Sequence, residues 1–229
     1  MKTILITGAN GNLGTAAVKK LLDEGYAVIG VDSANTHLEF ALSNAHFTFH
    51  TVNLLDETEA AGFIDTIIKQ YGKIDGALLL VGGFAMGTIE TITGTDIRKM
   101  YALNFETAYF IARPLFLHMK QYNYGRLVFV GSRPALQAEQ GKDALAYSLT
   151  KAMLFKLADF INASAKGTNV TASVLVPSTI DTAINRKSMP DANYDDWVKP
   201  EQLADILEFI CSDKGSSIRE AVYKGYNNG

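Results

Sequence analysis

The chain has 229 residues, of which 48% are hydrophobic and 20% are charged, and its formal net charge is −3. This length fits one α/β domain with a substantial core better than two domains. The charges form no large block of either sign, which argues against nucleic acid as a partner, because phosphate neutralisation needs clustered Lys and Arg.

Other sequence classes are also disfavoured. A single cysteine, Cys211, leaves no internal disulfide and suits a reducing compartment. The apolar runs, such as Ala77 to Val81, are too short for a membrane span, and the N-terminal run is too short for a signal peptide. His46 and His50 lie too far apart along a strand to share a metal ion. We therefore expect a cytoplasmic protein without a bound metal or a membrane partner.

Short apolar runs alternate with longer helical patterns, which predicts parallel strands joined by helices. Strands are expected at residues 4–6, 27–31, 47–52, 74–81, 126–130, 170–176 and 221–224. Helical patterns cover residues 13–22, 58–71, 96–122, 144–165 and 200–212. The predicted fold is a single-domain doubly wound Rossmann fold over residues 1–229, with a mostly parallel seven-stranded sheet. The irregular stretch 178–199 is long for a connection, which is typical of lids and binding loops.

Three glycines, Gly8, Gly11 and Gly14, follow the first strand and open the first helix. In a dinucleotide fold such glycines allow a tight turn, a close approach of the backbone to a pyrophosphate, and close packing of helix on sheet. The helix N-terminus then offers free N–H groups to the phosphates. The spacing is G-x-x-G-x-x-G rather than G-x-G-x-x-G, so a plain strand-to-helix connection is the alternative. The strand and helix on either side favour cofactor binding.

Asp32 follows the second strand, roughly 20 residues beyond the glycine turn. A carboxylate at this place can accept hydrogen bonds from both hydroxyls of an adenosine ribose, and it would repel a 2′-phosphate. An ordinary turn Asp is the alternative. We expect NAD(H) to be preferred, with NADP(H) still possible.

Tyr147 and Lys151 lie four residues apart in a predicted helix and so share one of its faces. A nearby ammonium would favour the phenolate and lower the pKa of Tyr147, which would then suit proton transfer to a substrate oxygen. A solvated helix face is the alternative for this pair. Ser132 follows the fifth strand, where a hydroxyl could bond a substrate carbonyl or simply cap a turn. Asn104 lies within a predicted helix and needs a partner if it is buried.

Taken together, the pattern resembles the short-chain dehydrogenase/reductase family over nearly the full length. The matching residues, in order, are Thr7-Gly8, Asp32, Asn104, Ser132, Tyr147 and Lys151. The resemblance implies hydride transfer with a nicotinamide cofactor. It implies that Tyr147 is the general acid/base and that Lys151 holds the nicotinamide ribose and tunes Tyr147. It also implies that Ser132 orients the substrate carbonyl and that Asn104 anchors a water in a proton relay.

The resemblance extends to the other cofactor contacts. The implied set comprises Gly8, Asn10, Gly11, Asn12, Leu13, Gly14, Asp32, Asn53, Leu54, Gly82, Gly83, Tyr147, Lys151, Pro177, Thr179 and Thr182. This chain departs from the family at three places. Asn53 replaces the commoner Asp, Gly82-Gly83 replaces Asn-Ala-Gly, and Ser178 stands where Gly is usual.

One branch of the family is closer still. The run from Asp181 to Pro190, with Trp197 beyond it, resembles dihydropteridine reductase, as do the glycine spacing and Gly82-Gly83-Phe84-Ala85. That branch lacks the catalytic Ser and Asn, whereas this chain has both, and a full set of four suits ordinary carbonyl reduction.

In the same loop, Arg186 and Lys187 could meet a substrate or the cofactor phosphates, or form a solvated basic pair. Met189, Tyr194 and Trp197 could cap the substrate, although loop aromatics more often pack the loop down.

Two classes of function remain. The first is an oxidoreductase that transfers hydride between nicotinamide and a carbonyl or quinonoid small molecule, which includes a dihydropteridine. The second is a non-catalytic dinucleotide-binding sensor or scaffold. A sugar-nucleotide epimerase is a weaker idea, because the chain is short for the extra substrate domain. The resemblance also implies a homodimer or homotetramer that pairs through the helices at 96–122 and 144–165.

Overall fold

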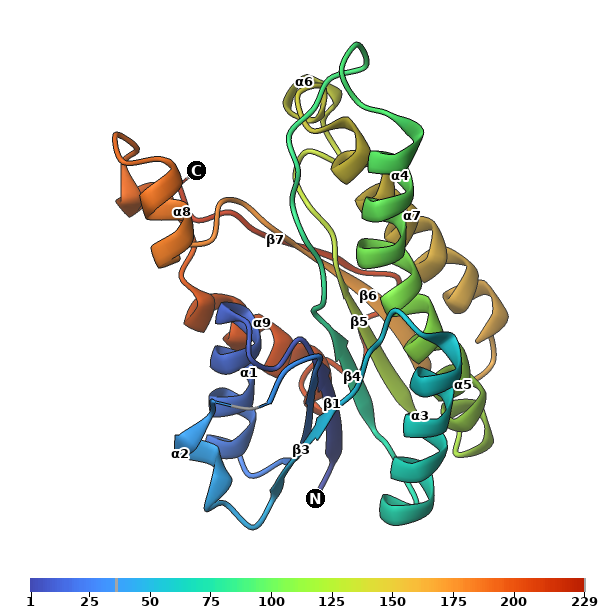
Figure 1. Cartoon of the computed structure of the whole chain (residues 1–229). Helices are drawn as coiled ribbons and strands as arrows, with labels where there is room; N and C mark the ends of the chain where they lie inside the picture. The colour runs from blue at the N-terminus through green and yellow to red at the C-terminus, as the bar shows by residue number, and fades with distance from the viewer. Residues whose placement is uncertain (36, 229) are drawn as a thin grey trace.

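The computed structural model describes residues 1–35 and 37–228. Within this part of the chain, seven strands form one sheet in the order β3-β2-β1-β4-β5-β6-β7, with every neighbouring pair parallel (Figure 1). The strands are β1 (Thr3–Thr7), β2 (Ala27–Asp32), β3 (Phe47–Thr51), β4 (Gly76–Leu79), β5 (Gly125–Val130), β6 (Val170–Pro177) and β7 (Val222–Gly225). The predicted doubly wound single-domain fold is confirmed.

Helices cover both faces of the sheet, as a parallel sheet requires. They are α1 (Asn12–Asp23), α2 (Glu39–Leu42), α3 (Glu57–Tyr71), α4 (Gly94–Tyr101), α5 (Thr107–Gln121), α6 (Ala138–Gly141), α7 (Leu145–Ser164), α8 (Ala183–Ser188) and α9 (Pro200–Cys211). In Figure 1, α1 and α9 lie on one side of the sheet and α3, α5 and α7 on the other. Alternate residues of β1 divide between the two cores, since Ile4 and Ile6 pack toward α1 and α9 while Leu5 packs toward α3 and α5.

The predicted helix at 96–122 is not continuous. It is divided into α4 and α5 by a π-helical turn, Ala102–Glu106, which contains Asn104. Such turns insert one extra residue into a helix and are frequent at functional sites. The sequence pattern missed the turn because the apolar spacing of α4 and α5 stays helical on both sides of it.

The stretch 178–199 is also more ordered than expected. It contains α8 and a 3₁₀ turn, Tyr194–Asp196. The one-turn helices α2 and α6 were not predicted, because four residues are too few to show a helical period.

The carboxyl ends of all the central strands meet at one edge of the sheet, where β1 is flanked by β2 and β4. The chain order changes direction at this point, which is where open α/β sheets bind ligands.

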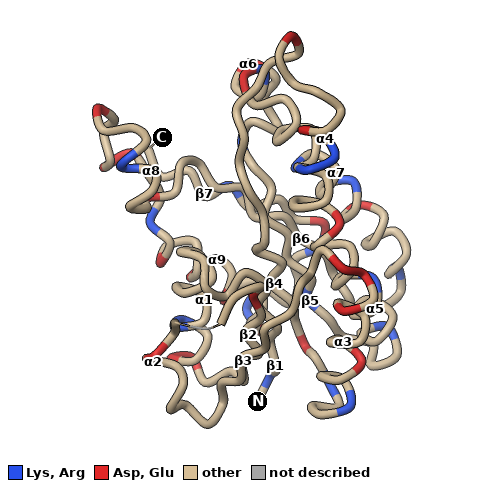
Figure 2. The backbone as a smooth tube through the Cα atoms, viewed as in Figure 1, with Lys and Arg blue, Asp and Glu red and all other residues tan. Residues whose placement is uncertain are grey.

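None of the described helices has the length and apolar character to cross a membrane. Lys and Arg are interspersed with Asp and Glu over the outer helices (Figure 2).

Candidate active site

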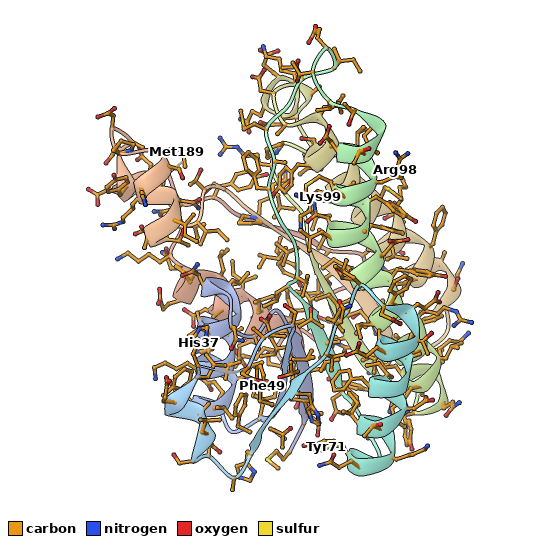
Figure 3. All side chains as sticks on the ribbon, in the orientation of Figure 1. His37, Phe49, Tyr71, Arg98, Lys99 and Met189 are labelled. Atoms are coloured by element: carbon orange, nitrogen blue, oxygen red, sulfur yellow. The ribbon has the colours of Figure 1, made fainter. Side chains whose placement is uncertain are left out.

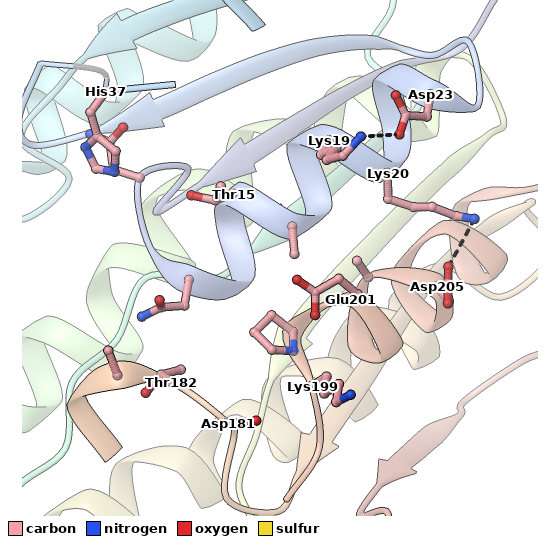
Figure 4. Close-up of a pocket in the computed structure, with 16 residues that line it drawn as sticks. Thr15, Lys19, Lys20, Asp23, His37, Asp181, Thr182, Lys199, Glu201 and Asp205 are labelled. Atoms are coloured by element: carbon pink, nitrogen blue, oxygen red, sulfur yellow. Dashed lines mark hydrogen bonds and ion pairs between the residues drawn. The ribbon is translucent and has the colours of Figure 1, made fainter. Parts of the chain in front are cut away.

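The turn between β1 and α1, residues 8–14, is called the glycine corner below, and its tight packing requires glycine at positions 8 and 14. Gly8 has a φ of 68°, a left-handed conformation that favours glycine. A Cβ on Gly14 would lie 2.1 Å from the Gly8 carbonyl oxygen, so α1 can approach the turn only with glycine at this position. The corner opens into a groove of about 580 Å³ between α1 and the start of α8 and α9 (Figure 4). Asn10, Asn12 and Thr182 line it.

Asp32 lies at the end of β2, beside the same corner. Its carboxylate accepts the Asn10 backbone N–H at 3.1 Å and the Ser33 N–H at 2.8 Å. The Oδ1 of Asn10 is buried without a hydrogen-bond partner in the described structure. Asn53 and Leu54 follow β3 close by, since the Val52 N–H donates to the Asp32 carbonyl at 2.9 Å. A carboxylate and an unused amide oxygen beside a glycine turn fit the adenosine half of a dinucleotide.

Asn104 is fully buried and ties the loop after β4 to α7. Its Oδ1 accepts the Gly83 N–H at 2.8 Å, and its Nδ2 donates to the Gly83 carbonyl at 3.1 Å. The same Nδ2 lies 3.2 Å from Thr150 Oγ1, and that hydroxyl donates to the Tyr147 carbonyl at 2.9 Å. Asn104 is therefore a satisfied core amide and, at the same time, a brace between the glycine loop and the helix that holds Tyr147.

Lys151 reaches from α7 toward the ends of β4 and β5. Its Nζ donates to the Val130 carbonyl at 2.9 Å, and a Cβ on Gly82 would lie 2.9 Å from it. A side chain on Gly82 would therefore displace both Lys151 and Asn104. Burial lowers the pKa of Lys151 to about 8, because its charge has lost the solvation of water.

Tyr147 and Ser132 face each other across the site, one from α7 and one from the loop after β5. Burial raises the pKa of the Tyr147 phenol, and a hydrogen bond with the Ser132 side chain lowers it in part. The prediction that Lys151 lowers this pKa is therefore wrong for the protein alone, since the ammonium bonds Val130 and burial dominates. The Ser132 hydroxyl also accepts the Ala135 N–H at 3.3 Å, so it serves the local turn as well.

Sequence reasoning gave no site role to Phe84, and the structure places it beside Tyr147. Its ring packs edge-on against the Tyr147 ring, with centroids 5.0 Å apart, yet the residue is 61% exposed. Thr150, which connects Asn104 to α7, was missed as well. The available signals were an aromatic residue directly after two loop glycines and a hydroxyl directly before Lys151.

The loop 178–199 begins at the carboxyl edge of β6. Pro177 ends that strand opposite Gly225, and Thr182 Oγ1 accepts the Asn185 N–H as the N-cap of α8. Arg186 is paired with Asp181, with its Nε 2.6 Å from a carboxylate oxygen, so it is held within the loop. Figure 3 shows Met189 at the end of α8 in this loop, across from Lys99 and Arg98 on α4.

The loop aromatics serve the loop itself. The rings of Tyr194 and Trp197 lie 4.9 Å apart, and Trp197 is buried. The Tyr194 hydroxyl donates to the Pro190 carbonyl at 3.0 Å. These two residues pack the loop down rather than cap a substrate, which is the commoner role of loop aromatics.

The family follows from comparison with known sequences. Residues 2–193 match the family model described as short chain dehydrogenase. The chain belongs to this family. It is therefore an oxidoreductase of a family that uses NAD or NADP.

The identity to individual relatives is below 30%. The chain is 29% identical to dihydropteridine reductase from Dictyostelium discoideum over 90% of this chain and 86% of that protein. It is 21% identical to 2,3-dihydro-2,3-dihydroxybenzoate dehydrogenase from Escherichia coli, over 95% of this chain and 92% of that protein.

Solved structures of this short chain dehydrogenase fold superpose closely. An oxidoreductase of the family from Burkholderia thailandensis gives a TM-score of 0.87 at 24% identity, over 99% of this chain and 91% of that one. A structure titled "ElxO with NADP Bound" gives a TM-score of 0.89 at 20% identity, over 97% of this chain and 96% of that one. A NAD+-bound xylitol dehydrogenase gives a TM-score of 0.87 at 17% identity, over 99% of this chain and 98% of that one.

Proposed function

We propose that the protein is an NADH-preferring reductase that delivers hydride to a carbonyl or quinonoid small molecule, with Tyr147 as the proton donor. The observation that supports this most directly is the convergence of Tyr147, Ser132 and Lys151 at the carboxyl edge of β4 and β5. The Tyr147 phenol bonds the buried Ser132 hydroxyl, and the buried Lys151 ammonium bonds the carbonyl of Val130, two residues before Ser132.

The glycine corner, Asp32 and the loop glycines fit a nicotinamide dinucleotide, which supplies the hydride when it is bound. Gly8 through Gly14 and Thr182 would hold its pyrophosphate, Asp32 and Asn53-Leu54 its adenosine, and Lys151 its nicotinamide ribose. Gly82 and Gly83, with Pro177 and Thr179, would line the nicotinamide. We assign these roles together with the catalytic ones because the residues meet at one strand edge.

Proton movement is the task of Tyr147. With a raised pKa the phenol is protonated near neutral pH, as it also is in free tyrosine, and this is the form that donates to a substrate oxygen or nitrogen. Ser132 holds the accepting atom and stabilises the phenolate that remains. Asn104 keeps the Gly83 loop in place behind the site and would anchor the water that restores the proton.

Asp32 supports a preference for NADH over NADPH. Its carboxylate accepts two backbone N–H groups, from Asn10 and Ser33, and these bonds fix its position at the end of β2. The charge would repel a 2′-phosphate at the same place.

The substrate is proposed only by class. The exposed Phe84 ring beside Tyr147 favours a flat substrate that can lie on an aromatic face. The similarity to dihydropteridine reductase adds a quinonoid dihydropterin to the carbonyls. A sensor without turnover is the second candidate, but it would have no use for a buried phenol with an ammonium on the next turn of the same helix.

We also propose a dimer or a tetramer of two such dimers. An apolar groove of about 470 Å³ lies on the outer face of α5 and α7. Phe105, Tyr109, Leu149, Met153, Leu157 and Phe160 line it. Phe160 is 67% exposed, and large apolar residues gathered in this way are typical of protein interfaces. Light scattering should give an oligomer for the wild type and a monomer for Phe160→Asp, and a monomeric wild type would refute the proposal.

A spectrophotometric screen tests the function. NADH oxidation is followed against aldehydes, ketones, quinones and a quinonoid dihydropterin, with NADPH in parallel. Turnover with one class, and faster with NADH, is expected. Tight NADH binding without turnover on any of these would favour the sensor.

A further inference from the structure

The segment that follows β7, residues 226–228, lies against the 178–199 loop. The side-chain Nδ2 of Asn227 donates to two carbonyls of that loop, Asp195 O and Trp197 O, both at 3.0 Å. One amide group therefore bonds the middle residue of the 3₁₀ turn at 194–196 and the residue that directly follows the turn. Asn227 is itself an exposed residue, so the core does not require it.

Contacts within the 178–199 loop hold its ends and its body together. Its two ends pair at Ile180 and Val198, where the Asp181 N–H donates to the Val198 carbonyl at 2.9 Å. Within it, Arg186 pairs with Asp181 and lies 4.7 Å over the Tyr194 ring. Internal bonds brace the body of the loop, so its position depends on its paired ends and on whatever holds the turn at 194–196.

The same segment contacts the Ser132 side of the site. Ser178 Oγ donates to the Tyr226 carbonyl at 2.8 Å. The Arg133 guanidinium lies 5.0 Å over the Tyr226 ring, and Arg133 is the neighbour of Ser132. Residues 226 and 227 thus connect the loop body to the segment that bears Ser132.

We propose that Asn227 is a positioning residue that fastens the 178–199 loop at the carboxyl edge of β6 and thereby sets the affinity for the substrate. The consequence for the substrate rests on the proposed reductase function, in which Thr182 of this loop would hold the cofactor's pyrophosphate; Thr182 lines the groove beside α1. The fastening itself rests only on the two hydrogen bonds and the braced loop. Loss of the Asn227 amide would free the loop without touching Tyr147, Ser132 or Lys151.

The substitution must respect the backbone. Asn227 has a φ of 53°, where Asn and Asp are tolerated and Ala is strained. Asn227→Asp is therefore the most informative variant. It keeps the side-chain shape and the backbone conformation, but it removes the Nδ2 donor and places a carboxylate oxygen against the carbonyls of Asp195 and Trp197. Asn228→Asp adds the same charge one residue later, and the structure shows no hydrogen bond of the Asn228 side chain within the described residues.

Two measurements decide the proposal. Limited trypsin digestion of the full chain probes the loop at Arg186 and Lys187, and steady-state kinetics probe its consequence. Asn227→Asp should be cleaved in the loop about tenfold faster than the wild type, since losing hydrogen bonds of this kind shifts an equilibrium by about that factor. It should raise KM for the substrate about tenfold, with kcat and NADH affinity within about twofold. Asn228→Asp should match the wild type in all of these.

The two ideas can fail separately. Equal cleavage rates for the Asn227 and Asn228 variants overturn the fastening, whatever the turnover. Faster cleavage with an unchanged KM overturns the positioning role. If the wild type turns over no substrate, the reductase proposal fails, the substrate consequence falls with it, and the cleavage ratio still decides whether Asn227 holds the loop.

Discussion

Asn104 holds Gly83 by both of its backbone polar groups, accepting its N–H at 2.8 Å and donating to its carbonyl at 3.1 Å. Asn104 lies within the π-helical turn Ala102–Glu106, a type of turn that is frequent at functional sites. Helix α7 joins the same arrangement through Thr150.

Replacing Asn104 with Leu should harm both folding and function. Two partly buried backbone groups of Gly83 would lose their partner, so the free energy of unfolding should fall by about 2–4 kcal/mol. Turnover should fall about 10- to 100-fold, because the loop behind the nicotinamide position is released. Urea unfolding and NADH oxidation measure the two effects.

Asn162 provides a matched control for this variant. Its side chain makes the same two-way contact with Ala172, at 2.8 Å for each bond, but it lies on α7 away from the site. Asn162→Leu should lose comparable stability and keep its turnover at temperatures where it stays folded. Equal activity losses in both variants would show that Asn104 has a structural role only.

A second prediction concerns the glycine corner. Gly14→Ala should raise the Kd for NADH at least about tenfold, since its Cβ would lie 2.1 Å from the Gly8 carbonyl oxygen and must push α1 off the turn. Gly62→Ala in α3 is the control, because nothing lies within 4 Å of its Cβ. That variant should gain about 0.5–1 kcal/mol of stability and bind NADH normally. Normal NADH binding by the Gly14 variant would remove the corner from the site.

Lys151→Met should stabilise the protein alone while it removes activity. Burial lowers the pKa of Lys151 from 10.5 to about 8. Below pH 8 the folded state therefore contains a buried charge that lowers its stability. The variant should therefore be more stable by about 1–3 kcal/mol near pH 7.

The pH dependence fixes the sign of this effect. Between about pH 8 and 10.5 the unfolded chain keeps the Lys151 proton and the folded chain does not, so wild-type stability gains from this group as pH rises. The advantage of Lys151→Met should shrink over that window in urea unfolding experiments. An advantage that is constant with pH, or a less stable variant, would mean that the ammonium is not penalised by burial.

Asp32 tests the cofactor preference. Asp32→Asn keeps the shape of the side chain but removes the charge that repels a 2′-phosphate. The ratio of kcat/KM for NADH to that for NADPH should fall by at least about tenfold, which is the effect of one unfavourable charge contact near the surface. Ser33→Ala, at the neighbouring exposed residue, should leave the ratio unchanged. A ratio that is the same in Asp32→Asn and the wild type would place the ribose elsewhere.

The sequence predicted the sheet and most of the helices because buried parallel strands and amphipathic helices each leave a distinct apolar period. It predicted that Asp32 and Ser132 lie at the carboxyl edge of the sheet, since residues that follow parallel strands must gather there. It could not predict that Asn104 sits in a π-helical turn, because one inserted residue leaves the apolar spacing intact. It also misjudged the pKa of Tyr147, which depends on how deeply the phenol is buried and on where Lys151 points. The role of Asn227 depends on a contact across 30 residues of chain that no local pattern reveals.

The most direct measurement is the paired comparison of NADH binding and turnover in Tyr147→Phe, which removes one hydroxyl and keeps the ring that packs on Phe84. We expect an NADH dissociation constant within about twofold of the wild type and a turnover lower by about a thousandfold, the usual size of a general-acid contribution. Turnover within about tenfold of the wild type, with NADH still bound, would contradict the assignment of Tyr147 as the proton donor.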